Sequence, residues 1–185
     1  MEMPRGIVIE AGTTPGQIEL SRDAASGVFV MNFLASASNP ENRWTTEFSR
    51  AVHKAFDAAE DSMRADPPRS PAALLTISSS PKFFSNGIDP VWAMNASGAE
   101  LANWNDVVMP AFARPVLMPC PTVCAIGGHA FGAGMMHALC HDHRMQRLER
   151  GFLCAIEVAI GVATPAPELT LFRHSMPANA WKRQR

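Results

Sequence analysis

The sequence has few of the features that mark secreted, membrane or nucleic-acid-binding proteins. Its four cysteines include no C-x-x-C pair and lie among apolar residues, so we expect buried thiols rather than disulfides. No apolar run reaches the ~20 residues that cross a bilayer, and no charged and then apolar targeting segment begins the chain. The 16 Lys and Arg are balanced by 17 Asp and Glu, without a basic stripe before the last four residues. These absences predict a soluble intracellular protein with no membrane span and no nucleic acid partner.

Two common site motifs are also incomplete. His137 and His141 have the spacing of a metal-binding pair, but no glutamate completes an H-E-x-x-H pattern. A surface or core histidine cluster is therefore favoured, and no metal is predicted. Gly132-Ala-Gly134 lacks the remaining glycine of G-x-G-x-x-G, which disfavours a dinucleotide cofactor. The chain does not end in a Ser-Lys-Leu type of peroxisomal signal.

The hydrophobic pattern predicts alternating strands and helices. An amphipathic helix is expected from an N-cap at Thr45 or Thr46 to a stop before Asp66, and a second helical stretch in two pieces, interrupted by Pro110 and Pro115. Residues 79–90 are expected to form a loop. Strands are expected at 6–10, 27–33, 72–78, 122–126 and 143–148. The 185 residues and the absence of internal repeats indicate one α/β domain with an at least partly parallel sheet.

The segment from Pro119 to Gly134 is typical of a strand, a glycine-rich loop and a helix N-terminus. Such a junction leaves backbone N–H groups unpaired at the positive end of the helix, and glycines let a ligand oxygen approach them. The ligand should therefore carry negative charge. At this point it could be a phosphate or an oxyanion.

Two further features are weak when taken singly. Phe84–Asp89 follows a predicted strand and could converge with the glycine-rich loop, although a Ser-Asn-Gly sequence is often only a turn. Glu157 lies inside the apolar run Phe152–Ile160, where desolvation would raise its pKa and suit it to proton transfer. Its alternative role is a capping glutamate that faces solvent.

Three ordered motifs give these features a common meaning. The segments Lys82–Asp89, Pro119–Gly134 and Arg150–Glu157, the last followed by Gly161, resemble the successive signatures of the crotonase, or enoyl-CoA hydratase/isomerase, superfamily. Asn39–Arg43 also resembles the early CoA-contacting segment of that family. The likeness extends from about Gly27 to Gly161.

The resemblance implies an α/β fold built as a spiral of ββα units, with the C-terminal helical part shortened. It divides the chain into a core domain, 1–161, and a short proline-containing tail, 162–185. The implied substrate is an acyl-CoA thioester, with CoA as part of the substrate and no separate cofactor. It leaves open a homo-oligomer, since family members form trimers, and it suggests a peroxisome or mitochondrion, with the cytoplasm otherwise expected.

The resemblance also implies roles for individual residues. Glu157 would be the catalytic glutamate, and the N–H groups of Asn86 and Ala133 would form an oxyanion hole. The hydratases of the family have a second glutamate at the position of Met136, whose thioether cannot transfer a proton. We therefore expect a Δ3,Δ2-enoyl-CoA isomerase, with a non-catalytic acyl-CoA-binding homologue, a hydratase or a thioesterase as alternatives. The expected substrate-binding residues are Ser85, Gly87, Ile88, Asp89, Gly132, Gly134 and Met136.

Overall fold

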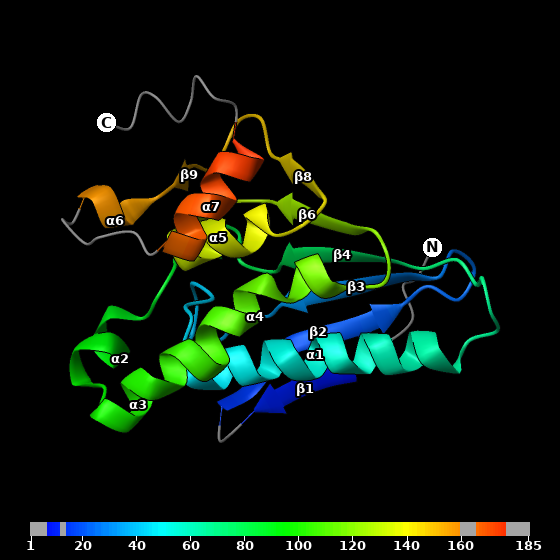
Figure 1. Ribbon diagram of the computed structural model, residues 1–185, viewed down its shortest axis with the longest axis horizontal. Helices are drawn as coiled ribbons and strands as arrows, with labels where there is room; N and C mark the ends of the chain where they lie inside the picture. The colour runs from blue at the N-terminus through cyan, green and yellow to red at the C-terminus, as the bar shows by residue number, and fades with distance from the viewer. Residues whose placement is uncertain (1–6, 12–13, 160–165, 177–185) are drawn as a thin grey trace.

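A six-stranded sheet forms the main layer of the protein (Figure 1). The computed structural model describes residues 7–11, 14–159 and 166–176. The strand order is β1-β2-β3-β4-β6-β8, with β1, β2 and β3 antiparallel and β3, β4, β6 and β8 parallel. The bounds are β1 (Ile7–Ala11), β2 (Thr14–Arg22), β3 (Val28–Phe33), β4 (Ala73–Ser78), β6 (Thr122–Ile126) and β8 (His143–Gln146). The predicted partly parallel α/β sheet is confirmed.

A second, smaller sheet consists of three short parallel strands. They are β5 (Phe83–Ser85), β7 (His129–Phe131) and β9 (Leu153–Cys154). Each follows one strand of the main sheet along the chain: β5 follows β4, β7 follows β6, and β9 follows β8. A helix then follows each of the three, so the chain repeats a strand, strand, helix unit. This is the expected spiral of ββα units.

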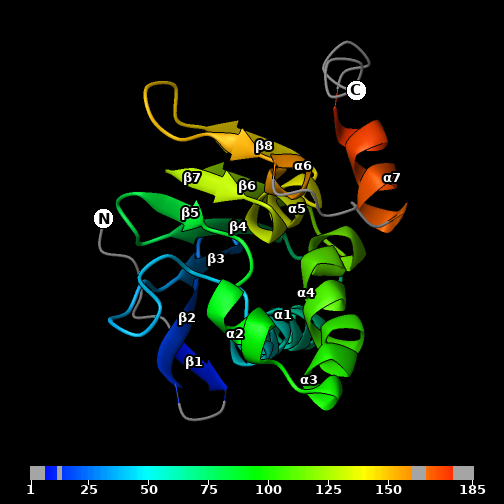
Figure 2. The same ribbon diagram turned by 90° about the vertical axis from the view of Figure 1, so that its left-hand side faces the viewer.

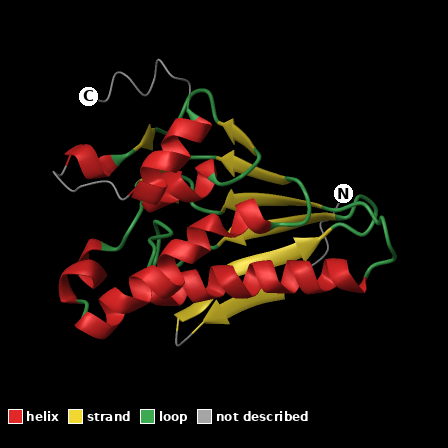
Figure 3. Cartoon of the chain, in the orientation of Figure 1, coloured by secondary structure: helices red, strands yellow, loops and turns green. Residues whose placement is uncertain are grey.

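Helices cover the sheets on one side, and α1 runs along the first strands of the main sheet (Figures 1 and 3). Thr45 is its N-cap and accepts a hydrogen bond from the Phe48 N–H, and the helix stops at Asp66, as predicted. Seen from one end in Figure 2, α3, α4 and α7 lie on the same side of the strands as α1. The bounds are α1 (Thr46–Ala65), α2 (Pro90–Asn95), α3 (Gly98–Asn103), α4 (Met109–Ala113), α5 (Ala133–Leu139), α6 (Ile156–Ala159) and α7 (Ala166–Ser175).

The helical stretch around residues 98–117 is continuous rather than divided into two pieces. A π-helical segment, Trp104–Val108, joins α3 to α4, and a 3-10 turn, Arg114–Leu117, follows α4. Pro110 and Pro115 each occupy one of the first two positions of a new segment, where a missing N–H costs little. The prolines therefore change the winding of the helix without ending it.

An aromatic cluster at the centre of the core joins α1, both sheets and α5. The ring centroids of Phe33 and Phe84 lie 5.4 Å apart, and those of Trp44 and Phe112 lie 4.6 Å apart. His137 belongs to the same cluster, with its ring 5.2 Å from that of Trp44. The predicted histidine cluster is thus part of the core, and this packing fixes β5 and α5, from which two walls of the candidate site are built.

The C-terminal part differs from the sequence-based expectation. The described part of the expected tail contains α7, whose Phe172 is buried, and α7 packs against α5 (Figure 1). The apolar run that begins at Phe152 divides into β9 and α6, and Phe152 itself is exposed.

All four cysteines are free thiols, and Cys120 and Cys124 are buried. None of the described helices is long and apolar enough to span a bilayer.

Candidate active site

The three segments that the sequence motifs singled out line one cavity of about 550 Å³. One wall is the loop between β5 and α2, a second is the junction between β7 and α5, and a third is the start of α6. The lining residues are Arg43, Asn86, Gly87, Ile88, Pro90, Ala93, Met94, Phe131, Gly132, Ala133, Ile156 and Glu157. Segments more than 70 residues apart in the chain thus meet around one space, which lies beyond the ends of parallel strands.

The junction between β7 and α5 presents an unpaired backbone donor. Gly132 is the N-cap of α5 with φ +47°, a conformation that favours glycine, and no side chain caps the helix. Its own N–H donates to the Cys154 carbonyl oxygen at 2.9 Å, which joins the junction to β9. The next N–H, that of Ala133, has no hydrogen-bond partner in the described part of the chain. It is therefore available to a ligand oxygen in the cavity.

The loop after β5 supplies a different donor from the one that the resemblance implied. The Asn86 N–H donates to the Glu41 carbonyl oxygen at 2.9 Å, so it is not available, and this expectation is corrected. Trp44 N–H donates to the Gly87 carbonyl oxygen, and Asp89 N–H donates to the Trp44 carbonyl oxygen, which leaves Ile88 between two paired neighbours. The Ile88 N–H has no partner among the described residues. Ile88 also lines the cavity, so its N–H takes the place that was assigned to Asn86.

The Glu157 carboxylate lies next to the helix junction. A Cβ atom placed on Gly132 would be only 3.0 Å from Glu157 Oε1, so the carboxylate occupies space that the missing side chain leaves. Its Oε2 atom is buried and has no hydrogen-bond partner among the described residues. A carboxylate with an unengaged oxygen, beside an available N–H of the following residue, can accept a proton from a ligand in this cavity.

Asn86 and Arg43 keep the loop in place through Glu41. The Asn86 side-chain amide donates to Glu41 Oε2 at 2.9 Å, and Arg43 Nε donates to the same oxygen at 2.8 Å. The amide hydrogen bond, and secondarily Arg43, lowers the pKa of the Glu41 carboxyl. Arg43 also donates to the Ile88 carbonyl oxygen at 3.1 Å. The segment that resembles a CoA-contacting motif thus supports the loop and places a cation on the cavity wall.

Four expected substrate-binding residues lie outside this cavity. Ser85 is buried and donates its hydroxyl to the Asn42 carbonyl oxygen at 2.7 Å, and Gly134 packs directly against Ser85. Asp89 caps α2 by accepting from the N–H groups of its second and third following residues. Met136 is buried and lines a separate apolar cavity. Ser85, Gly134 and Asp89 thus position the loop and the helix. Gly87, Ile88 and Gly132 line the cavity itself.

Comparisons with known proteins agree with this arrangement. Over 118 residues the chain is 36% identical to the peroxisomal enoyl-CoA delta isomerase 2 of Arabidopsis thaliana, a match that covers 60% of this chain and 49% of that protein. Enoyl-CoA delta isomerase 3 of the same plant is 40% identical over 87 residues, covering 45% of this chain and 37% of that protein. The chain therefore spans half or less of the length of these curated relatives. No family model matches the chain.

Solved structures give the fold. Human mitochondrial delta3-delta2-enoyl-CoA isomerase superimposes with a TM-score of 0.78 at 23% identity, covering 90% of this chain and 62% of the human one. A probable enoyl-CoA hydratase from Mycobacterium tuberculosis gives a TM-score of 0.77 at 21% identity, covering 91% and 65%. These similarities show the fold of this chain. Its fold is the crotonase fold, and the sequence motifs that resembled the family lie where this fold brings them together.

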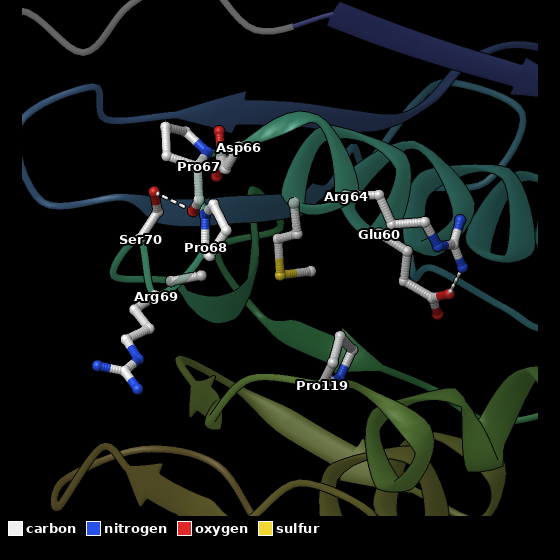
Figure 4. Close-up of a pocket in the computed structure, with 10 residues that line it drawn as sticks. Glu60, Arg64, Asp66, Pro67, Pro68, Arg69, Ser70 and Pro119 are labelled. Atoms are coloured by element: carbon white, nitrogen blue, oxygen red, sulfur yellow. Dashed lines mark hydrogen bonds and ion pairs between the residues drawn. The ribbon is translucent and has the colours of Figure 1, made fainter.

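Three other hollows among the described residues contain none of the predicted site residues or only one of them. A pocket of about 300 Å³ lies between the end of α1 and the loop that follows it, with the Arg64–Glu60 ion pair on its wall (Figure 4). Asp89 lines a hollow of about 530 Å³ beside α2 and the start of α1. Within the described residues, no group of three or more His, Cys, Asp and Glu side chains could hold a metal ion.

Proposed function

We propose that the protein is an enoyl-CoA isomerase that converts a 3-enoyl-CoA into the 2-trans isomer. The observation that carries this proposal is the meeting, in one cavity, of the Glu157 carboxylate with Ile88 and Ala133, whose N–H groups are unpaired in the described chain. Two such donors can hold a thioester oxygen, and a carboxylate beside them can take a proton from the adjacent carbon. The names of the plant relatives support the same reaction.

The proposed reaction moves one proton along the acyl chain. The Glu157 carboxylate removes a proton from C2, and the electron pair moves into the thioester so that its oxygen becomes an enolate. The N–H groups of Ile88 and Ala133 stabilise this charge, each contributing about 3 kcal/mol by analogy with other oxyanion holes. Protonated Glu157 then returns the proton to C4, and the double bond moves from C3 to C2. Atoms and charge balance without any further reactant.

The number of carboxylates in the cavity favours isomerisation over hydration. Glu157 is the one carboxylate that lines the cavity among the residues that the structure describes. Water addition needs one group to activate the water and another to protonate the substrate, whereas proton migration needs a single shuttle. Met136, at the position of the second glutamate of hydratases, cannot serve as that other group.

The test is a product analysis with purified protein and a 3-enoyl-CoA in ¹⁸O-labelled water. We expect the 2-trans-enoyl thioester, detected by its conjugated absorbance, with no ¹⁸O in the acyl group. Incorporation of ¹⁸O into the acyl chain would instead identify a hydratase, and ¹⁸O in a released acid would identify a thioesterase. Calorimetric binding of the acyl-CoA without any conversion would overturn the enzymatic proposal and favour the non-catalytic alternative.

A further inference from the structure

A second cavity, of about 360 Å³, lies where α7 packs against α5 and α4. Its wall is almost entirely apolar, with one acidic exception, Glu168. Glu168 is only 8% exposed, and its Oε2 atom is buried without a hydrogen-bond partner in the part of the chain that the structure describes. The lining residues are Met109, Phe112, Ala113, Val116, Met136, Cys140, Pro167, Glu168, Thr170, Leu171 and His174.

This cavity is linked to the candidate active site through α5 and through charge. Ala133, on the first turn of α5, lines the active-site cavity, and Met136, three residues later, lines the apolar one. Glu168 interacts electrostatically with Glu157. Among the described residues, each of the two glutamates has one buried carboxylate oxygen without a hydrogen-bond partner, and α5 contributes to the walls of both cavities.

We infer that Glu168 is a positioning residue of the active site. In its neutral form, the Glu168 carboxyl leaves the apolar cavity uncharged for the acyl chain of the substrate and adds no second negative charge next to Glu157. This inference rests on the proposed isomerase function, because it assigns the apolar cavity to the acyl part of an acyl-CoA. Glu168 itself transfers no proton to or from the substrate.

The surroundings of Glu168 favour the neutral carboxyl. Burial, and secondarily the charge of Glu157, raises the pKa of Glu168 to about 7. The described α4 and the turn after it contribute only apolar side chains to this cavity. The titratable groups that face it are Cys140 on α5, whose pKa burial raises to about 12, and His174 on α7 itself. Cys140 is a neutral thiol, which leaves His174 as the one side chain of the described wall that can carry a compensating positive charge.

Ionisation of Glu168 should weaken the binding of substrate. A second negative charge beside Glu157, on the wall of an apolar cavity, would have to be desolvated whenever an acyl chain entered. The affinity for substrate should therefore fall as the pH rises through about 7. A glutamine at this position has nearly the same shape and cannot ionise, so it should preserve binding at high pH.

The first experiment follows the carboxyl directly, without reference to activity. Protein labelled with ¹³C at the glutamate side-chain carboxyl is titrated by NMR, in the wild type and in Glu168→Gln, Glu157→Gln and Glu149→Gln. We expect one resonance that titrates near pH 7, that is absent from Glu168→Gln, and that titrates at lower pH in Glu157→Gln. The exposed Glu149 serves as the matched control and should leave this resonance unchanged. A Glu168 that titrates near 4 would overturn the inference.

The second experiment measures kcat and KM for a 3-enoyl-CoA between pH 6 and 9. In the wild type and in Glu149→Gln, we expect KM to rise about tenfold per pH unit above 7, with a smaller change in kcat. In Glu168→Gln, this rise should be absent. The same alkaline rise in Glu168→Gln would contradict the inference while leaving the isomerase proposal intact. Absence of isomerisation by the wild type at every pH would instead contradict the proposed function.

Discussion

The N–H donors and the Glu157 carboxylate, the two halves of the candidate site, are supported by very different parts of the molecule. The N–H donors belong to the junctions after β5 and β7, which are packed on the aromatic core, and Phe84 in β5 is 0% exposed. Glu157 belongs to the four-residue helix α6 after the two-residue strand β9, and Phe152 just before that strand is 68% exposed. The donor half is thus fixed by the core, whereas the carboxylate half contributes little to it.

This contrast has a physical reason. An oxyanion hole works only if its donors are already aimed at the position of the charge, and dense packing holds them there. A base that accepts and returns a proton must reach two carbon atoms, so a less constrained support suits it. We therefore expect substitutions in the donor half to affect stability and activity together, and substitutions around Glu157 to affect activity alone.

The largest expected effect compares two phenylalanines. Phe84→Ala should lower the free energy of unfolding by about 3–5 kcal/mol, because it leaves a cavity in the aromatic core. Phe152→Ala should change it by less than about 0.5 kcal/mol, because the ring is already mostly in solvent. Urea unfolding of both variants measures the difference. Equal destabilisation by the two changes would contradict the division of the site into a packed half and an exposed half.

The next effect is at the boundary between the halves. In Gly132→Ala, the new Cβ would lie 3.0 Å from Glu157 Oε1, and the residue would have to keep a φ of +47°. Displacing the carboxylate and the Ala133 N–H together should lower kcat by at least about 100-fold. Gly98→Ala is the matched control, since a Cβ there meets no atom within 4 Å. Steady-state isomerase kinetics of both variants measure this effect. A near-normal kcat in Gly132→Ala would contradict the assignment of the Glu157 carboxylate and the Ala133 N–H to the active site.

A smaller effect concerns acid stability of the packed half. Burial lowers the pKa of His137 well below 6.5 and that of His141 to about 4, so both are neutral in the folded protein. Between pH 6.5 and about 4 the unfolded chain binds more protons, and stability must fall as the pH falls. His137→Phe keeps the aromatic packing and should remove about 1 kcal/mol of this loss at pH 5.5. Urea unfolding at pH 7.5 and 5.5 measures this loss of stability in the wild type and in His137→Phe. An equal loss in the two proteins would contradict the prediction.

Much of the fold could be predicted because it rests on strong local signals. The helix after Thr45 has a capping residue, a three- and four-residue apolar repeat and a stop before two prolines, and it has the expected bounds. β3, β4 and β6 are buried strands with β-branched or apolar runs, and their positions are also confirmed. β2 was missed, although Ile18 and Leu20 alternate toward the core, because Pro15 and Gly16 interrupt its beginning.

The unpredicted parts depend on contacts between distant segments. β5 and β7 have three residues each, too few for any periodicity, and they exist because β7 pairs with β5 on one side and with β9 on the other. The choice of Ile88 over Asn86 as the available donor is set by Glu41, whose carbonyl oxygen accepts from the Asn86 N–H and which lies more than 40 residues away in the chain. α7 lies in a segment whose prolines suggested a tail, but Pro167 stands in the first turn of the helix, where it is tolerated.

The measurement that tests the central claim most directly is the kcat of Glu157→Gln with a 3-enoyl-CoA at neutral pH. The exposed Glu149→Gln serves as the matched control. We predict that Glu157→Gln lowers kcat by about 10²- to 10⁴-fold. The melting temperature of Glu157→Gln should stay unchanged, and Glu149→Gln should match the wild type. A kcat for Glu157→Gln within about threefold of the wild type would contradict the claim that this carboxylate moves the proton.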